Sequence, residues 1–286
     1  MSIAIARDGT EIYYEAEGDG PPVVLLHEFG GDLRSLDLLS AELRGYRRIR
    51  YNARGFPPSG VPDDPSRYSQ ALATGDLATV MDAAGLSCAH IVGSSMGAVT
   101  ALDFALRHEA RCLSLSLMGY GYGTSQDELA AFRLGTERNI ALIEQEGMVA
   151  FAKAYADRDS RLPFKARDPA GHARLTERIA ARPAIGAILT LRQIQLERTP
   201  IDGPARQALQ RFTKPLLIVT GDRDGGSLQP SVDLRKLVRD SALAVLPRAG
   251  HTLHLESHTE LARLLSAFID EAQRAPSHHE MHSIEQ

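Results

Sequence analysis

The chain has 286 residues, of which 43% are hydrophobic, and its formal net charge is −4. This length can bury a substantial core in one large domain or two small ones, and we expect one domain with an insertion. The slightly acidic balance, with a pI near 6.2, excludes a basic surface for nucleic acid or a polybasic membrane patch, so we expect a small-molecule partner.

The chain shows no charged leader followed by an apolar run, and no stretch approaches the roughly 18 apolar residues that a membrane helix needs. Cys88 and Cys112 lie beside or within expected buried strands, which is typical of reduced thiols rather than of a disulfide framework. We therefore expect a soluble, cytoplasmic protein.

Strand-like and helix-like segments alternate along the chain, as judged by apolar runs and by apolar residues at helical spacing. The predicted strands cover residues 3–6, 11–17, 23–26, 47–51, 111–118, 215–220 and 243–246, with one more directly before a turn at 93–97. The predicted helices of this framework cover residues 69–84 and about 230–238, with others after Ser35, after residue 97 and after Ser257. Such alternation implies a mostly parallel sheet covered on both faces by helices.

Local signals mark several element boundaries. Asp8-Gly9 is a hairpin turn signal, so we expect the first two strands to pair antiparallel at the edge of the sheet. Ser35 is the expected N-cap of the following helix. Ser257 and Glu260 have the spacing of a capping box before the last helix.

Residues 124–212 differ from the rest of the chain. They show no convincing strand, and helical segments over 127–145, 148–155 and 184–196 are separated by Gly and Pro. We expect an all-helical cap here, inserted into a core of residues 1–123 and 213–274. Phe132, Phe151 and Tyr155 would line a pocket beneath the cap or form its own core. Residues 275–286 lose apolar periodicity and are expected to be a flexible, solvated tail rather than a metal site.

A nucleophile-elbow pattern stands at the turn after the central strand. Gly93-Ser94-Ser95-Met96-Gly97 matches G-x-S-x-G, with an apolar strand before it and a helical stripe after it. The turn strains the backbone at the serine, and small neighbours give it room. Free backbone N–H groups at the helix start favour an oxyanion there, so the motif predicts acyl transfer at Ser95.

With this elbow and these strands, the chain resembles the α/β-hydrolase superfamily over nearly all of its length, to about Ala272. The resemblance implies an eight-stranded, mostly parallel sheet with a helical cap and no cofactor or metal. It also implies the chain order nucleophile, acid, base, which Ser95, Asp224 and His251 match.

Each of these residues has a chemical reason for its place. Serine needs a base within hydrogen-bond reach, and an imidazole titrates near the operating pH, which suits His251. The carboxylate holds the imidazole tautomer and stabilises its charged form. Asp224 matches the family's position for this group, whereas Asp222 is expected to brace the loop. His254 is the alternative base and is expected to be a contact near a helix.

The resemblance also points to two backbone N–H groups as the oxyanion hole, those of Met96 and Phe29, with His27, Glu28 and Tyr120 as possible pocket residues. Glu28 stands where the family commonly has glycine. It is expected to point outward or to pair with an arginine such as Arg54, or else to face the site with a raised pKa.

A second departure from the family pattern follows in Asn52-Ala53-Arg54-Gly55, where Asn52 replaces an acid. We expect only a structural consequence there.

These features favour a serine hydrolase of a small carboxylic ester or lactone that works through an acyl-enzyme on Ser95. Two alternatives resemble other members of the fold: hydrolysis of a carbon–carbon bond in a dienoic diketone, and a non-hydrolytic small-molecule receptor or lyase. The residues leave the substrate and the oligomeric state open.

Overall fold

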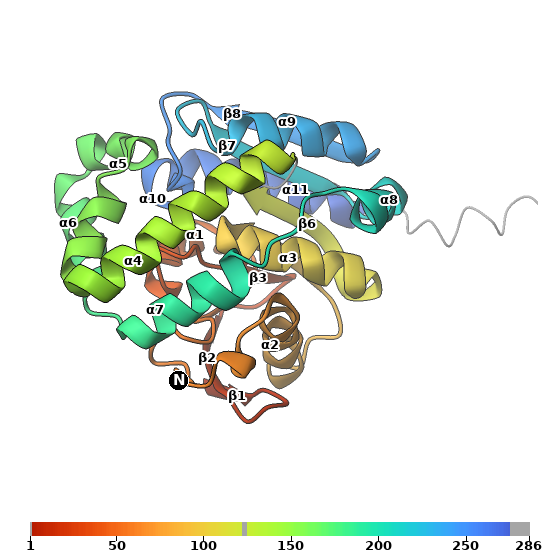
Figure 1. The fold of residues 1–286 in the computed structure, drawn as a ribbon. Helices are drawn as coiled ribbons and strands as arrows, with labels where there is room; N and C mark the ends of the chain where they lie inside the picture. Colours follow the sequence, from red (N-terminus) through yellow and green to blue (C-terminus); the bar gives the residue numbers. More distant parts are fainter. Residues whose placement is uncertain (1, 122–124, 275–286) are drawn as a thin grey trace, which may run out of the picture.

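The computed structural model describes residues 2–121 and 125–274, which form one sheet with helices on both faces (Figure 1). The strands are β1 (Ser2–Ile5), β2 (Glu11–Glu17), β3 (Pro22–Leu26), β4 (Arg47–Tyr51), β5 (Ala89–Ser94), β6 (Cys112–Met118), β7 (Leu216–Gly221) and β8 (Ser241–Leu246). Their order in the eight-stranded sheet is β1-β2-β4-β3-β5-β6-β7-β8. Strand β2 pairs antiparallel with β1 and β4, and every other pairing is parallel. The expected fold class is confirmed.

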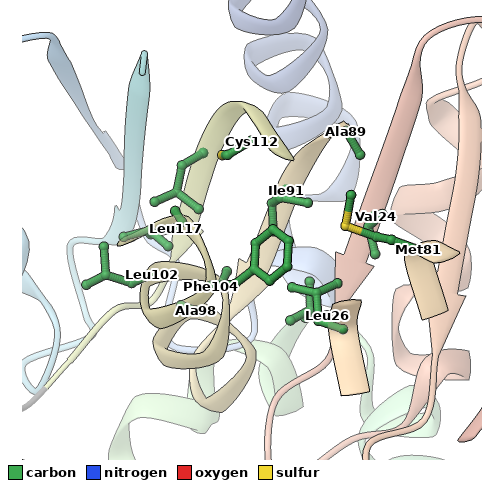
Figure 2. Close-up of a cluster of buried hydrophobic side chains, with 14 of the residues drawn as sticks. Val24, Leu26, Met81, Ala89, Ile91, Ala98, Leu102, Phe104, Cys112 and Leu117 are labelled. Carbon is green, nitrogen blue, oxygen red and sulfur yellow. The ribbon is translucent and has the colours of Figure 1, made fainter. Parts of the chain in front are cut away.

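The apolar side chains of each central strand are buried on both faces of the sheet, because successive side chains point to opposite faces. In β3, Val24 and Leu26 belong to one buried layer, whereas Val23 and Leu25 belong to the other. Figure 2 shows the first layer, in which Phe104 and other helix residues meet the apolar side chains of the sheet. All of these strand side chains are almost fully buried, which explains why the strands read as continuous apolar runs.

Helices supply the covering side chains. Their bounds are α1 (Asp37–Glu42), α2 (Gln70–Ala83), α3 (Met96–Arg107), α4 (Gln126–Ala156), α5 (Leu162–Arg167), α6 (Pro169–Ala180), α7 (Ala184–Thr190), α8 (Gly203–Arg211), α9 (Leu228–Leu237), α10 (Leu253–Glu256) and α11 (His258–Arg274). Helices α2, α3 and α9 pack on one face of the sheet, and α1 and α11 pack on the other.

Helices α4 to α8 lie between β6 and β7 in the chain and are called the helical insertion below. Helices α4 to α7 form one group in front of the sheet, shown in green in Figure 1. Helix α8 lies apart from that group, and its Leu209 belongs to the core beside α9. Within α4, Gly147 has a φ of 83° and interrupts the helix, where the sequence predicts a break between residues 145 and 148.

Two local predictions need correction. Ser35 does not cap a helix, because the chain turns earlier: Asp32 accepts from the N–H of Arg34 and begins a 3-10 turn over Leu33–Leu36. Ser35 instead donates to the backbone oxygen of Asp32. The helices α5, α6 and α8 were also not predicted. Two of these three are short, and pattern reading detects short helices poorly.

Arg54 is almost fully buried and does not pair with Glu28, contrary to one expectation. Its guanidinium donates to both carboxylate oxygens of Asp76, at 2.7 and 2.6 Å, and to Asp8 at 2.9 Å. The neighbouring Asn52 accepts from the N–H of Leu33 and donates to a backbone oxygen. This segment therefore fastens loops together, as expected for Asn52.

Among the described helices, none combines the length and the apolar character needed to cross a bilayer. Both Cys88 and Cys112 are free thiols, and burial raises the pKa of Cys112 to about 12. The predicted tail over 275–286 lies outside the described residues.

Candidate active site

Ser95 stands at the junction of β5 and α3, at the carboxyl edge of the sheet. Its φ of 52° is positive, which is rare for a residue with a side chain. Its N–H donates to the backbone oxygen of Met118 at the end of β6, so neighbouring strands hold this conformation. The turn therefore presents the Ser95 hydroxyl outward from the edge of the sheet.

The two glycines of the motif give the turn the room that the sequence predicts. A Cβ on Gly93 would lie 2.3 Å from the backbone oxygen of Gly97, and one on Gly97 would lie 2.6 Å from that of Leu26. Real Cβ atoms do not approach backbone oxygens so closely, so the tight strand-to-helix turn requires glycine at both positions.

Ser95, His251 and Asp224 form one hydrogen-bonded series. His251 Nδ1 lies 2.7 Å from a carboxylate oxygen of Asp224, and His251 Nε2 lies 2.9 Å from Ser95 Oγ. Because an ionised carboxylate only accepts, Nδ1 carries the ring proton and Nε2 is left to accept from the Ser95 hydroxyl. The three residues follow β5, β7 and β8, whose carboxyl ends lie at the same edge of the sheet.

Asp224 and Asp222 have the different positions that the sequence analysis expected. Asp222 accepts from the backbone N–H of Ala249 at 3.2 Å and so ties two loops together. Asp224 is almost fully buried against the imidazole. Burial raises the pKa of Asp224, but the charge of His251 and its hydrogen bond outweigh this, and the pKa lies below its ordinary value of 3.8. Asp224 is therefore the carboxylate that faces His251.

The expected oxyanion donors flank Ser95. Met96 is the first residue of α3, so its N–H precedes the first intrahelical bond. Phe29 lies in the loop after β3 and lines the same cavity as Ser95 and His251. The role of these N–H groups remains a prediction.

Glu28 has a position that the sequence analysis did not foresee. Its side chain is buried, and one carboxylate oxygen lies 3.0 Å from His254 Nε2 and 3.2 Å from the Ser35 hydroxyl oxygen. On the other side of the ring, His254 Nδ1 lies 3.3 Å from Ser94 Oγ. Glu28 and His254 thus lie under the elbow, away from Ser95.

The electrostatics of Glu28 correct the alternative of a raised pKa. Burial raises the pKa of Glu28, but the combined effects of the nearby His254 and His27 and of a backbone hydrogen bond outweigh it, so the pKa lies well below the ordinary value of 4.5. The other carboxylate oxygen has no hydrogen-bond partner among the described residues. The contact with His254 is therefore the main side-chain interaction of this carboxylate in the interior.

His27 is also structural in this arrangement. Its Nδ1 donates to the backbone oxygen of Glu28 at 2.7 Å, and its Nε2 accepts from the N–H of Ala53 at 3.0 Å. Burial lowers the pKa of His27, which suits a neutral ring that uses both nitrogens in this way.

A cavity of about 700 Å³ opens above Ser95 and His251 and is bounded by the helical insertion. Phe132 and Tyr155 line it, whereas Phe151 is fully buried in the apolar core between the helices. The expected pocket residues His27, Glu28 and Tyr120 are not among the described residues that line this cavity. Tyr120 is instead buried in the core beside the sheet.

Two arginines that the sequence analysis did not single out line the same cavity. Arg161 lies in the 3-10 turn Asp159–Arg161 that follows α4, and Arg198 lies between α7 and α8. Neither lies in a recognisable motif. The insertion carries many charged residues, so the presence of an arginine in it does not separate cavity residues from surface residues.

Within the described ranges, no group of three or more His, Cys, Asp or Glu side chains is placed to hold a metal ion. The site is thus described by protein groups alone: a hydroxyl, an imidazole, a carboxylate and nearby N–H donors.

Comparisons with known proteins identify the family and the fold. A family model described as alpha/beta hydrolase fold matches residues 21–258. A Bacillus subtilis (strain 168) protein, assigned provisionally as a 2-succinyl-6-hydroxy-2,4-cyclohexadiene-1-carboxylate synthase, is 25% identical over 90% of this chain and 95% of its own. Lipase 1 of Psychrobacter immobilis is 26% identical over 93% of this chain and 83% of its own. The enol-lactonase of Burkholderia xenovorans LB400 superposes with a TM-score of 0.80 at 22% identity, over 94% of this chain and all of that structure.

Proposed function

The chain belongs to the alpha/beta hydrolase family, and on that basis we propose that it hydrolyses a carboxylic ester or lactone of a small molecule through an acyl-enzyme on Ser95. One observation carries the proposal: the hydrogen-bonded series from Ser95 Oγ through His251 to Asp224, at 2.9 and 2.7 Å. A lipase and an enol-lactonase among the similar proteins support this reaction class.

The first half-reaction follows from these positions. Ser95 Oγ attacks the ester carbonyl while His251 Nε2 takes its proton, and the buried Asp224 stabilises the imidazolium that forms. The carbonyl oxygen gains the negative charge, and the N–H groups of Met96 and Phe29 would bind it. His251 then returns the proton to the leaving alkoxide, which departs as the alcohol.

In the second half-reaction, water replaces the alcohol. His251 takes a proton from the water as it attacks the acyl carbon, and returns it to Ser95 Oγ as the acid leaves. For a lactone the alcohol and the acid remain one molecule, and a single hydroxy acid is released. The cavity of about 700 Å³ is large enough for a small-molecule ester of either kind.

Active-site labelling tests this proposal. A fluorophosphonate should modify Ser95, identified by peptide mass, and Ser95→Ala should lose both the label and at least about 1,000-fold in ester hydrolysis. Ser94→Ala is the matched control, since it removes the neighbouring hydroxyl of the same turn, and it should still be labelled. Ester turnover that survives Ser95→Ala would refute the proposal.

The same preparation separates the two alternatives. Faster turnover of a dienoic diketone than of any ester would favour carbon–carbon bond hydrolysis. Tight ligand binding without turnover would favour a receptor.

A further inference from the structure

The cavity above Ser95 holds guanidinium groups without a matching acid. Arg161 is only 3% exposed, yet no ion pair among the described residues includes Arg161 or Arg198. The Nε atoms of both side chains are buried and have no hydrogen-bond partner in the described part of the chain. A buried cation with an unused donor is unfavourable unless a bound anion completes it.

The surroundings hold the Arg161 guanidinium in a fixed place. Its Nη2 donates to the Tyr155 hydroxyl at 2.9 Å, and the guanidinium carbon lies 4.2 Å from the centre of the Tyr155 ring. The same Nη2 lies 3.4 Å from where a Cβ on Gly30 would stand. Gly30 follows Phe29, so this cation lies beside the loop expected to bind the oxyanion.

The turn that carries Arg161 also contacts the catalytic loop. The backbone oxygen of Ser160 accepts from the N–H of His251 at 2.7 Å. The guanidinium is therefore near the reacting groups, and Arg161 is close enough to Asp224 to lower the pKa of that carboxyl.

Arg198 lies in the same cavity among apolar and aromatic groups. Its guanidinium carbon is 4.6 Å from the centre of the Phe132 ring, and burial lowers its pKa to about 10. Such a shift is typical of a cation that lacks a counter-ion.

The other acids that line the cavity are engaged or peripheral. Asp224 faces His251, and Asp157 is paired with Lys165 at 2.6 Å. Asp159 is exposed to solvent. None of the acids lining the cavity therefore compensates the buried guanidinium of Arg161 or the half-buried side chain of Arg198.

We propose that the natural substrate is an ester or lactone that carries a carboxylate, and that Arg161 and Arg198 bind this carboxylate in the cavity while Ser95 attacks the carbonyl. This inference rests on the proposed function and adds the substrate class. A planar guanidinium with a free Nε–H matches a carboxylate with two parallel hydrogen bonds. Arg161 is the principal ligand because it is the more buried of the two and Tyr155 holds its guanidinium in place. Because Arg161 lies beside the oxyanion loop, a short spacer between carboxylate and carbonyl is expected.

Matched substrates test this. Monomethyl succinate carries the carboxylate, and methyl succinamate replaces it with a neutral amide of the same shape; the glutarate and adipate pairs vary the spacer. We expect kcat/KM, followed in a pH-stat, to favour the acid of the best pair by at least about 30-fold, the lower range for a buried charge pair. Arg161→Met should reduce this ratio to near one, and Arg161→Lys should give an intermediate ratio.

Arg192→Met is the matched control, because Arg192 is an exposed arginine of the same insertion that pairs with Glu144 outside the cavity. It should leave the ratio as in the wild type. If circular dichroism shows that Arg161→Met does not fold, Arg198→Met serves as a second cavity variant. It should also reduce the ratio of kcat/KM for the acid to that for its amide. A wild-type ratio near one in all three pairs would overturn the proposal, as would an unchanged ratio in both folded cavity variants.

A binding measurement distinguishes failure of the carboxylate proposal from failure of the proposed hydrolysis. Calorimetric titration of Ser95→Ala with the intact monomethyl esters needs no turnover, and binding should be lost when Arg161→Met is added. If Ser95→Ala still hydrolyses the ester, the proposed function fails. If the ester and its amide bind equally, only the carboxylate proposal fails.

Discussion

Glu28 and His254 meet at 3.0 Å in the interior, with both side chains at most 1% exposed, directly beneath the turn that presents Ser95. Glu28 precedes Phe29 of the expected oxyanion loop, and His254 reaches Ser94, which precedes Ser95. The pair thus connects the two backbone segments whose relative position an oxyanion hole requires.

Glu28→Gln should therefore destabilise the protein. Removing one partner of a buried polar pair costs about 3–5 kcal/mol in the free energy of unfolding, since His254 is left in the interior without its carboxylate. Urea denaturation at pH 7 measures this, and the control Glu42→Gln, at a partly exposed contact with His258, should cost less than about 1 kcal/mol. Equal losses in the free energy of unfolding for the two variants would show that burial of the Glu28 pair does not increase its contribution to stability.

The same pair predicts a pH dependence of stability. The pKa of Glu28 in the folded state lies below its ordinary value of 4.5, so its contribution to stability is present above pH 4.5. It is lost as the pH falls through the lower, folded-state pKa. Between pH 6 and 3 the wild type should lose more stability than Glu28→Gln does, and parallel curves for the two proteins would contradict the assignment.

The sequence predicted the three residues at the edge of the sheet because each depends on local features. Ser95 lies in a pattern whose glycines the turn requires, and Asp224 and His251 follow recognisable strands. Glu28 was misjudged because its partner, His254, is distant in the chain and no local pattern records their contact. Arg161 and Arg198 were missed for a similar reason. They line the cavity only because of how the helical insertion folds, and no local pattern indicates this.

Arg54→Met should destabilise the protein without affecting the site directly. It would leave Asp76, which is 1% exposed, as a buried carboxylate without its cation. The expected cost is about 3–5 kcal/mol, or about 10 °C in the midpoint of thermal unfolding. Asp8→Asn is the comparison, because Asp8 is 21% exposed and its loss should cost less. A larger effect for Asp8→Asn would reverse this ranking.

The two aspartates after β7 should differ in their effect on catalysis. Asp224→Asn removes the negative charge that stabilises a protonated His251, and its amide N–H can face Nδ1 and favour the wrong tautomer, so kcat should fall by roughly 1,000- to 10,000-fold with the fold retained. Asp222→Asn keeps a side-chain oxygen that can accept from Ala249, and kcat should change by less than about tenfold. Similar losses of kcat in both variants would contradict the assignment of Asp224, rather than Asp222, as the carboxylate that acts on His251.

A substitution at Gly250 tests whether the helical insertion fixes the position of the loop that carries His251. A Cβ at this position would lie 2.1 Å from the backbone oxygen of Ser160, the same oxygen that accepts from the N–H of His251. Gly250→Ala must therefore displace the turn that carries Arg161, the His251 loop, or both.

Overpacking of this kind costs about 1–3 kcal/mol of stability, and displacement of the base by about 1 Å can cost roughly 100-fold in rate. We expect kcat/KM of Gly250→Ala to fall by that order, measured at a temperature where circular dichroism shows the variant folded. Gly45→Ala is the control, because nothing lies within 4 Å of the added Cβ there, and its activity should equal the wild type. Full activity in folded Gly250→Ala would mean that the loop tolerates displacement and that the insertion does not fix the position of His251.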